Sequence, residues 1–211
     1  KYPKNKNITA EDIDRALKFA VDRGYQTIKL YFLVGLPDEK IEDMDGIIGI
    51  VKNLLFYGGR RIKRIRVSLS VFTPKPHTPL QWFGFAGHNE ITEKIRYICS
   101  RLKYNKIDIV WHSYNTSAVE AIIARGSNRV GDVILRAFEN GARMDNWTEF
   151  FKFEYWKQAV EDCGLTFDDL HSPLSPADKL PWDFIDTGIK KEFLIDEYHN
   201  FLNARQTTDC G

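Results

Sequence analysis

The sequence predicts an α/β fold in which parallel strands alternate with helices, as in part of a TIM-like (β/α) barrel. Two apolar runs of strand length, at 27–34 and 64–72, are each followed by a segment with helical periodicity, and a third short run lies at 107–111. This order favours parallel pairing with right-handed crossovers. Later in the chain the pattern becomes helical, so we expect half of a barrel over 1–113 and a mostly helical C-terminal extension over 114–211.

The helices expected in the first half are marked at their ends by capping residues and glycines. Thr9, with Asp12 three residues later, forms a weaker relative of the capping box, and Gly24 is a natural stop for this first helix. Apolar residues at helical spacing predict a second helix over 38–57 and a third over 89–104. The sequence starts with a helix, without the strand that a β/α unit places before it. We therefore expect the first half of the domain to be missing from this chain.

The second half of the sequence has the capping residues and turn signals of a series of helices. We expect helices from Asn115 or Thr116 to Arg125, from Asn128 to Gly141, from Asp145 or Asn146 to Gly164, and over 191–203. The third of these is rich in aromatic residues on several faces, which favours a helix buried among its neighbours. The segment over 165–190 is rich in Pro and Asp, so we expect it to wrap the surface.

Composition excludes several classes of protein. The 211 residues are 43% hydrophobic and 28% charged, enough to bury a sizeable core, so disorder is not expected. The formal net charge of +1 excludes a global field that would attract nucleic acid or an anionic membrane. Cys99, Cys163 and Cys210 are far apart and lack metal-ligand spacing, which favours a reducing, cytoplasmic setting. No apolar stretch approaches the roughly 20 residues that span a bilayer, so no membrane partner is expected.

The apolar run over 27–34 ends in a Gly35-Leu36-Pro37 turn, which Asp38 and Glu39 follow. Gly35 permits close approach of a ligand to the backbone, and Pro37 fixes the exit of the chain. The carboxyl ends of the strands are where α/β barrels have their active sites. Two interpretations stay open. One is a ligand-binding turn, and the other is an ordinary strand-to-helix turn whose carboxylates favour the helix N-terminus.

Polar side chains alternate with apolar ones along the two longer strands. The first strand carries Lys29 and Tyr31, and the second carries Arg66, Ser68 and Ser70. If the apolar faces pack on outer helices, these side chains point into the barrel. A polar interior is unusual for a packed barrel and is expected of one that holds a substrate. The alternative is a strand surface that faces solvent in a truncated domain.

The second strand ends in a loop with three prolines, Thr73-Pro74-Lys75-Pro76-His77-Thr78-Pro79. The prolines lower the entropy cost of presenting Lys75 and His77 to a ligand. His77 has the chemistry of a proton-transfer group or a metal ligand, although a single loop histidine is more often neither. A basic cluster over 60–66 either contacts phosphates or is a solvated strand entrance.

Two of these segments resemble radical S-adenosylmethionine (radical SAM) proteins. Lys29 to Glu39 is similar to the fifth barrel strand and loop of that family, and Val67 to Trp82 is similar to the sixth strand and its exit loop. The Pro-Lys-Pro-His-Thr-Pro and Gln-Trp combination is the more specific match and indicates the branch whose members often carry a cobalamin-binding-like domain. Further similar segments, which extend the resemblance over most of the chain, are Ala124 to Val130, Asn140 to Trp147 and Trp182 to Gly188.

The resemblance implies two cofactors, S-adenosylmethionine and a [4Fe-4S] cluster, and leaves cobalamin open. In the family a Cys-x3-Cys-x2-Cys motif holds the cluster, and this chain lacks that motif. The residues that the resemblance places at S-adenosylmethionine are Tyr31, Gly35, Leu36, Pro37, Glu39, Ser68 and Ser70. Those expected to face the substrate are Lys29, Arg66, Lys75 and His77. No metal ligand is assigned, although Cys210-Gly211 resembles the start of a cysteine-rich tail.

Two functional hypotheses follow. In the first, the chain is the C-terminal half of a radical SAM enzyme and is not catalytic alone, and the enzyme abstracts hydrogen or transfers a methyl or methylthio group. In the second, it is a non-catalytic RNA- or protein-binding module that uses the basic cluster over 60–66 and the aromatic region over 147–156. A hydrolytic enzyme is disfavoured, because the sequence has no Ser-His-Asp arrangement. Since a half-barrel exposes sheet edges, we expect pairing with the missing half or a homodimer.

Overall fold

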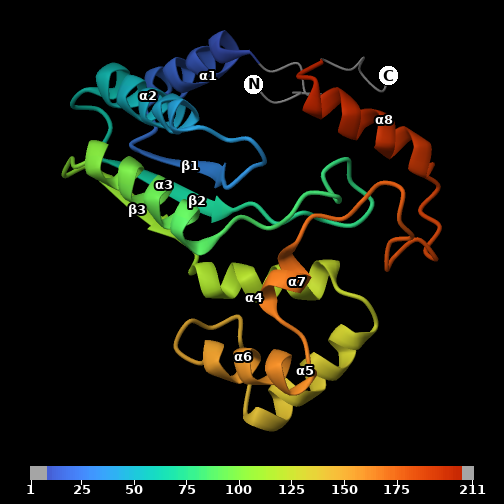
Figure 1. Cartoon of the computed structure of the whole chain (residues 1–211). Coiled ribbons are helices and arrows are strands. Elements are labelled where there is room, and N and C mark those ends of the chain that lie inside the picture. The colour runs from blue at the N-terminus through green and yellow to red at the C-terminus, as the bar shows by residue number, and fades with distance from the viewer. Residues whose placement is uncertain (1–8, 206–211) are drawn as a thin grey trace. The chain divides into compact units, whose positions relative to one another are not determined.

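The computed structural model describes residues 9–205 and shows an α/β chain that divides into two compact units (Figure 1). The first unit takes the described residues up to Phe72 together with Ala86–His112. The second unit takes Thr73–Phe85 and Ser113–Arg205. By its contacts, the proline-rich loop therefore belongs to the second unit.

A parallel sheet of three strands, in the order β1-β2-β3, forms the centre of the first unit. The strands are β1 (Thr27–Val34), β2 (Arg64–Val71) and β3 (Ile107–Trp111). Along the whole of β1 each residue has a partner in β2, from Thr27 opposite Arg64 to Val34 opposite Val71. The prediction of an α/β fold with parallel strands is confirmed, and the predicted bounds 27–34 and 107–111 agree with the structure.

Three helices of the first unit, α1 (Ala10–Asp22), α2 (Ile41–Gly58) and α3 (His88–Arg101), cover one face of this sheet (Figure 1). α1 begins at the predicted cap, where the Asp12 amide donates to Oγ1 of Thr9 at 3.1 Å and the Thr9 amide donates to the Asp12 carboxylate at 2.9 Å. α2 begins at Ile41 and not at residue 38, because Asp38 has a φ of +56°, outside the helical region. α3 ends at Arg101, before the predicted residue 104.

The sheet face under these helices is the core of the first unit. On β2, Ile65, Val67 and Leu69 are fully buried, while the residues that alternate with them are half-buried. The helices contribute further fully buried side chains, among them Met44, Val51 and Leu54 of α2 and Ile98 of α3. The alternation read from the sequence therefore correctly separates the core-facing side chains of β2 from the others.

The second unit is helical. Its helices are α4 (Tyr114–Arg125), α5 (Arg129–Asn140), α6 (Phe153–Asp162), α7 (Phe167–His171) and α8 (Lys191–Leu202). One apolar cluster joins α4, α5 and α6 through buried residues such as Ile122, Val133 and Ala159. A second cluster consists of Trp82, Leu180, Trp182 and Leu194. Among residues 9–205, no helix is both long enough and apolar enough to cross a membrane.

The predicted helix from Asp145 or Asn146 to Gly164 is wrong in its first half. α6 begins only at Phe153, and residues 145–150 form turns and bends. The carboxylate of Asp145, which was expected to cap the helix, instead accepts a hydrogen bond from the indole of Trp156 at 3.1 Å. Trp147 and Phe150 are 57% and 50% exposed, so the expectation that this aromatic region is buried is wrong for both.

The segment over 165–190, which was expected to wrap the surface, contains the short helix α7, which was not predicted. Oγ1 of Thr166 accepts from the Asp169 amide at 3.1 Å and caps this short helix. The cap is hard to recognise in the sequence because the surrounding Pro and Asp residues dominate the local composition. The bounds of α5 and α8 agree with prediction, since Asn128 and Gly141 flank α5 and α8 covers Lys191–Leu202.

Candidate cofactor and substrate site

β1 ends in the Gly35-Leu36-Pro37 turn, at the carboxyl end of the parallel sheet. Gly35 has a φ of +85°, a left-handed conformation that glycine adopts without strain. A Cβ at this position would lie 2.4 Å from Cδ1 of Ile91 in α3 and 3.3 Å from Cβ of Ala86. The turn therefore needs glycine both for its conformation and for its packing. Gly35 was expected to allow a ligand to approach the backbone closely. On the side where a Cβ would lie, it is Ile91 of α3 that approaches.

A buried carboxylate holds this turn from within the first unit. The side chain of Glu39 is 2% exposed and its Oε2 lies 3.0 Å from Nζ of Lys94, which is 8% exposed. The same oxygen accepts the amide of Gly35 at 2.7 Å. Lys94 also lies 2.5 Å from the carboxylate of Glu90. Burial acts to lower the pKa of Lys94, but hydrogen bonds to Glu90 and Glu39 outweigh it and hold the pKa above its ordinary value.

Glu39 acts on the turn and not on the helix that follows. The sequence placed Asp38 and Glu39 at a helix N-terminus, whereas Glu39 precedes α2 and reaches back to Gly35. Its Oε2 already accepts the Gly35 amide and Nζ of Lys94. Glu39 was predicted to contact the cofactor, and in the structure it instead orders the backbone of the turn. Lys94 was not predicted. The sequence does contain a sign of its burial, because Lys94 lies within the apolar stripe of α3, between the buried Ile91 and Ile98.

The predicted polar side chains of β1 and β2 share one face of the sheet. The register places Lys29 opposite Arg66 and Tyr31 opposite Ser68, and Ser70 lies opposite Leu33. Lys29 and Tyr31 are exposed, while Arg66, Ser68 and Ser70 are half-buried. Because the strands are parallel, this face leads toward the Gly35 turn at its carboxyl end. The structure thus brings together the members of the predicted site that lie in the first unit.

Asp108 of β3 extends this polar face and was not predicted. It lies opposite Arg66 in the register, and its Oδ2 accepts Nε and Nη2 of Arg66 at 3.1 and 3.0 Å. The pair neutralises Arg66. Lys29, in the same row, has no ion-pair partner within residues 9–205. The available positive charge of this row is therefore that of Lys29.

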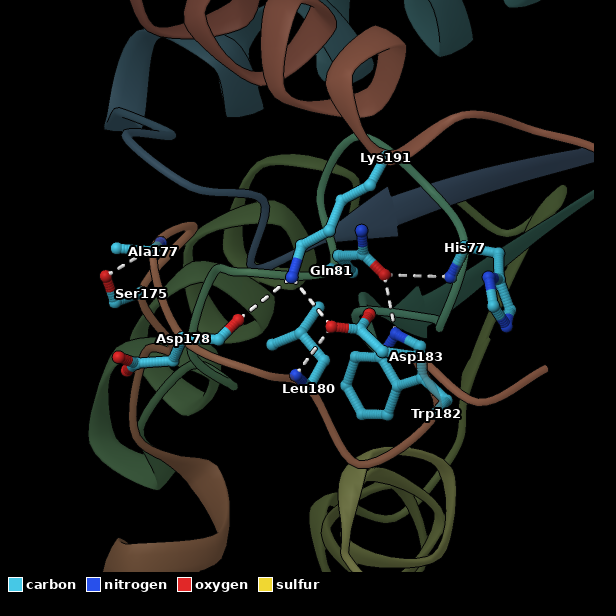
Figure 2. Close-up of polar contacts among 9 residues, drawn as sticks. All are labelled: His77, Gln81, Ser175, Ala177, Asp178, Leu180, Trp182, Asp183 and Lys191. Atoms are coloured by element: carbon cyan, nitrogen blue, oxygen red, sulfur yellow. Dashed lines mark hydrogen bonds and ion pairs between the residues drawn. The ribbon is translucent and has the colours of Figure 1, made fainter. Parts of the chain in front are cut away.

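The two remaining predicted residues, Lys75 and His77, lie in the proline-rich loop of the second unit. Lys75 is exposed, and its Nζ lies 2.5 Å from the carboxylate of Glu120 in α4. His77 is half-buried with a φ of +56°, and its amide donates to Oε1 of Gln81 at 2.9 Å (Figure 2). Gln81 is 2% exposed. Lys75 is therefore a paired surface cation, whereas His77 is held in an unusual conformation by a buried amide.

The part of the chain that the structure describes offers no metal centre. Within residues 9–205, no group of three or more His, Cys, Asp or Glu side chains is arranged to hold a metal ion. Cys99 and Cys163 are free thiols, and burial raises the pKa of Cys99, which favours its protonated form. Cys210 lies outside the described residues.

The chain is similar to an uncharacterized protein of Methanocaldococcus jannaschii, with 31% identity over 125 residues. The aligned part is 59% of this chain but 27% of that protein, so the chain matches little more than a quarter of its relative. No family model and no solved structure match the chain. The name of that protein states no activity, so the function of this chain has to be inferred from the site itself.

Proposed function

We propose that the first unit is half of a TIM-like barrel in a radical SAM enzyme, and that the Gly35 turn and the polar sheet face form part of its S-adenosylmethionine pocket. The observation that supports this most directly is the register of β1 and β2, which aligns Lys29 with Arg66 and Tyr31 with Ser68. The interior of a closed barrel is normally packed with branched apolar side chains. A polar face that ends at an ordered glycine turn suits a barrel that holds a ligand.

The chemistry of the polar face suits S-adenosylmethionine. That cofactor offers ribose hydroxyls, an amino group and a carboxylate. The hydroxyls of Tyr31, Ser68 and Ser70 can both donate and accept hydrogen bonds. Lys29, the exposed cation of the face, suits the carboxylate. The Gly35 turn contributes its backbone, which Glu39 and Lys94 hold in place.

The [4Fe-4S] cluster that the resemblance implies does not fit the described residues. Cys99 belongs to the first unit and Cys163 to the second, and neither lies in a group of candidate ligands. We therefore assign the three thiolates to another part of a longer protein that includes this chain. To the chain itself we assign binding and orientation of the cofactor, and no step of the reaction.

The missing half of the barrel would pair with an outer strand of the sheet. β1 and β3 are the outer strands of the three-stranded order, so each presents one edge for further pairing. When the 211-residue chain is produced alone, we expect two copies to pair through such an edge. Light scattering should give the mass of a dimer. A monomer at working concentrations would contradict this part of the proposal.

The deciding experiment uses the longer protein, purified without oxygen. We expect iron and sulfide in the ratio of a [4Fe-4S] cluster and an electron paramagnetic resonance signal of the reduced cluster that shifts when S-adenosylmethionine is added. No cluster after reconstitution would refute the radical SAM assignment.

The role of the turn is tested by Gly35→Val in the same protein. A side chain at this position meets Ile91, displaces the turn and should weaken S-adenosylmethionine binding. Gly87→Val is the matched control, because a Cβ at Gly87 meets nothing within 4 Å. If folded Gly35→Val protein binds the cofactor as tightly as the control, the turn is not part of the pocket.

A second candidate function, an RNA-binding module, is favoured by one observation: Trp147 and Phe150 are about half exposed and available for base stacking. The basic cluster over 60–66 supports it less, since Arg61 and Arg66 pair with Asp22 and Asp108. This function predicts RNA binding that weakens steeply with salt and that Trp147→Ala reduces. Salt-independent or absent binding would rule it out.

A further inference from the structure

His77 has two features that ordinary loop histidines lack. Its φ of +56° is a left-handed conformation that is uncommon for a residue with a Cβ. Its Nε2 is buried and has no hydrogen-bond partner among the described residues. Most buried polar atoms in folded proteins are hydrogen-bonded, so an orphan of this kind calls for an explanation. Strained backbone conformations also persist only where the surroundings enforce them.

Gln81 enforces the conformation of His77. Its Oε1 accepts the His77 amide at 2.9 Å and the indole Nε1 of Trp182 at 2.7 Å (Figure 2). Both partners are N–H donors, and only the oxygen of a glutamine amide can accept them, so the orientation of the amide is fixed. Gln81 and Trp182 are 2% and 5% exposed, which keeps water from competing for either bond.

Trp182 is in turn fixed by its neighbours in the second unit. Its side chain packs with Trp82, Leu180 and Leu194 in one apolar cluster. The next residue, Asp183, accepts the Leu180 amide at 2.9 Å and Nζ of Lys191 at 2.7 Å (Figure 2). A hydrogen bond thus joins the two ends of the 180–183 segment that carries Trp182, and Lys191 holds Asp183 from outside it.

We infer that Gln81 and Trp182 are positioning residues for His77, and that they hold its backbone so that Nε2 stays buried and unpaired until a ligand with a complementary hydrogen-bonding group takes it. This inference depends on the proposed function in one respect, namely that His77 faces the substrate. The hydrogen bonds from Gln81 to His77 and Trp182 do not depend on it.

The test uses the 211-residue chain and two variants that each remove one buried indole N–H and keep an aromatic ring. Trp182→Phe removes the bond to Gln81, and Trp156→Phe, the matched control, removes the bond to Asp145. Trp156 is also 5% exposed, so the two variants bear a similar loss of packing. The readouts are the hydrogen-exchange rate of the His77 amide and the rate at which diethylpyrocarbonate modifies its imidazole. His112, which is exposed, is the internal reference for the second rate.

We expect Trp182→Phe to raise both rates at His77 by about fivefold, the effect of one ordinary hydrogen bond, and Trp156→Phe to leave them unchanged. Equal effects of the two variants would show a general loss of stability and would overturn the inference. Unchanged rates in Trp182→Phe would also overturn it. S-adenosylmethionine and the cluster do not enter these readouts. Loss of the radical SAM assignment would therefore leave the positioning intact, and a failed positioning test would leave the assignment intact.

Discussion

The loops that follow β1 and β2 both contain a left-handed residue, and they hold it by different means. After β1 positive φ values fall on Gly35 and Asp38, and a buried ion pair between Glu39 and Lys94 fixes the turn at Gly35. After β2 a positive φ falls on His77, and a neutral pair of side chains, Gln81 and Trp182, fixes the loop. At Gly35 the residue type already accepts the conformation. At His77 the neighbours must impose it.

This difference determines what each loop tolerates. Removing one partner of a buried ion pair strongly destabilises a protein, because the remaining charge loses its compensation. A buried neutral network loses only hydrogen bonds of ordinary strength. A single substitution should therefore lower the free energy of unfolding more in the first loop than in the second. In the second loop the main effect should be on the local conformation.

The largest effect is expected from Glu39→Ala. The variant leaves the buried Lys94 ammonium with a half-exposed partner, Glu90, and removes the acceptor of the Gly35 amide. Chemical denaturation should show a loss of about 3 to 5 kcal/mol in the free energy of unfolding. The control is Glu90→Gln, whose side chain is 49% exposed and whose loss should be below about 1 kcal/mol. Similar losses in the two variants would show that burial of Glu39 does not matter.

The next effect is expected from Gly35→Ala. The added methyl group is placed against Ile91 in a left-handed conformation, which should reduce stability by about 3 kcal/mol. Gly46→Ala is the control, since a Cβ there meets nothing within 4 Å and the residue lies inside α2. Alanine should stabilise that helix by about 0.5 to 1 kcal/mol. Opposite signs in thermal unfolding are therefore expected, and a neutral Gly35→Ala would refute the close packing.

A smaller loss is expected from Gln81→Leu. The variant leaves the His77 amide and the Trp182 indole without their acceptor, which should reduce stability by about 2 kcal/mol. Gln158→Leu, on the exposed face of α6, removes a hydrogen bond to Asp162 and should be nearly neutral. If Gln81→Leu were as damaging as Glu39→Ala, the distinction between an ionic and a neutral support would not hold.

The sequence predicted the strands of the first unit well because the evidence for them is local. Short apolar runs predicted the bounds of β1 and β3, and the polar side chains that alternate along β1 and β2 indeed lie on one face. The capping residues Thr9, Asn128 and Gly141 were predicted for the same reason. Such signals act over a few residues and need no knowledge of the fold.

The supports of both loops could not be predicted, because they join residues that are distant along the chain. Trp182 bonds Gln81 across 101 residues, and Lys94 meets Glu39 only because α3 packs beside the turn. The helix expected from Asp145 failed for a related reason. Oδ2 of Asp145 accepts the Trp156 indole, a contact across the turn that helical composition alone does not show.

The two units should also differ in their response to mild acid, because the second contains a half-buried histidine with a lowered pKa. His171 places Nε2 3.1 Å from the carbonyl oxygen of Ala118. Burial first, and then the nearby charge of Arg125, lowers its pKa, although the Ala118 carbonyl and Asp168 act in the opposite direction. Arg125 is itself 3% exposed, and burial lowers its pKa to about 10, so it remains charged at neutral pH.

The sign of the effect follows from proton uptake. A histidine whose pKa is lower in the folded state than its ordinary 6.5 binds more protons when unfolded, so stability is complete above that value and falls as the pH drops below it. Urea unfolding followed by tryptophan fluorescence reports mainly on the second unit, which holds Trp82, Trp147, Trp156 and Trp182. Between pH 7 and 5 the midpoint should fall in the native chain. In His171→Gln, which keeps an N–H donor for Ala118 but does not titrate, it should fall less. Parallel pH profiles in the two proteins would show that His171 is not the source of the acid sensitivity.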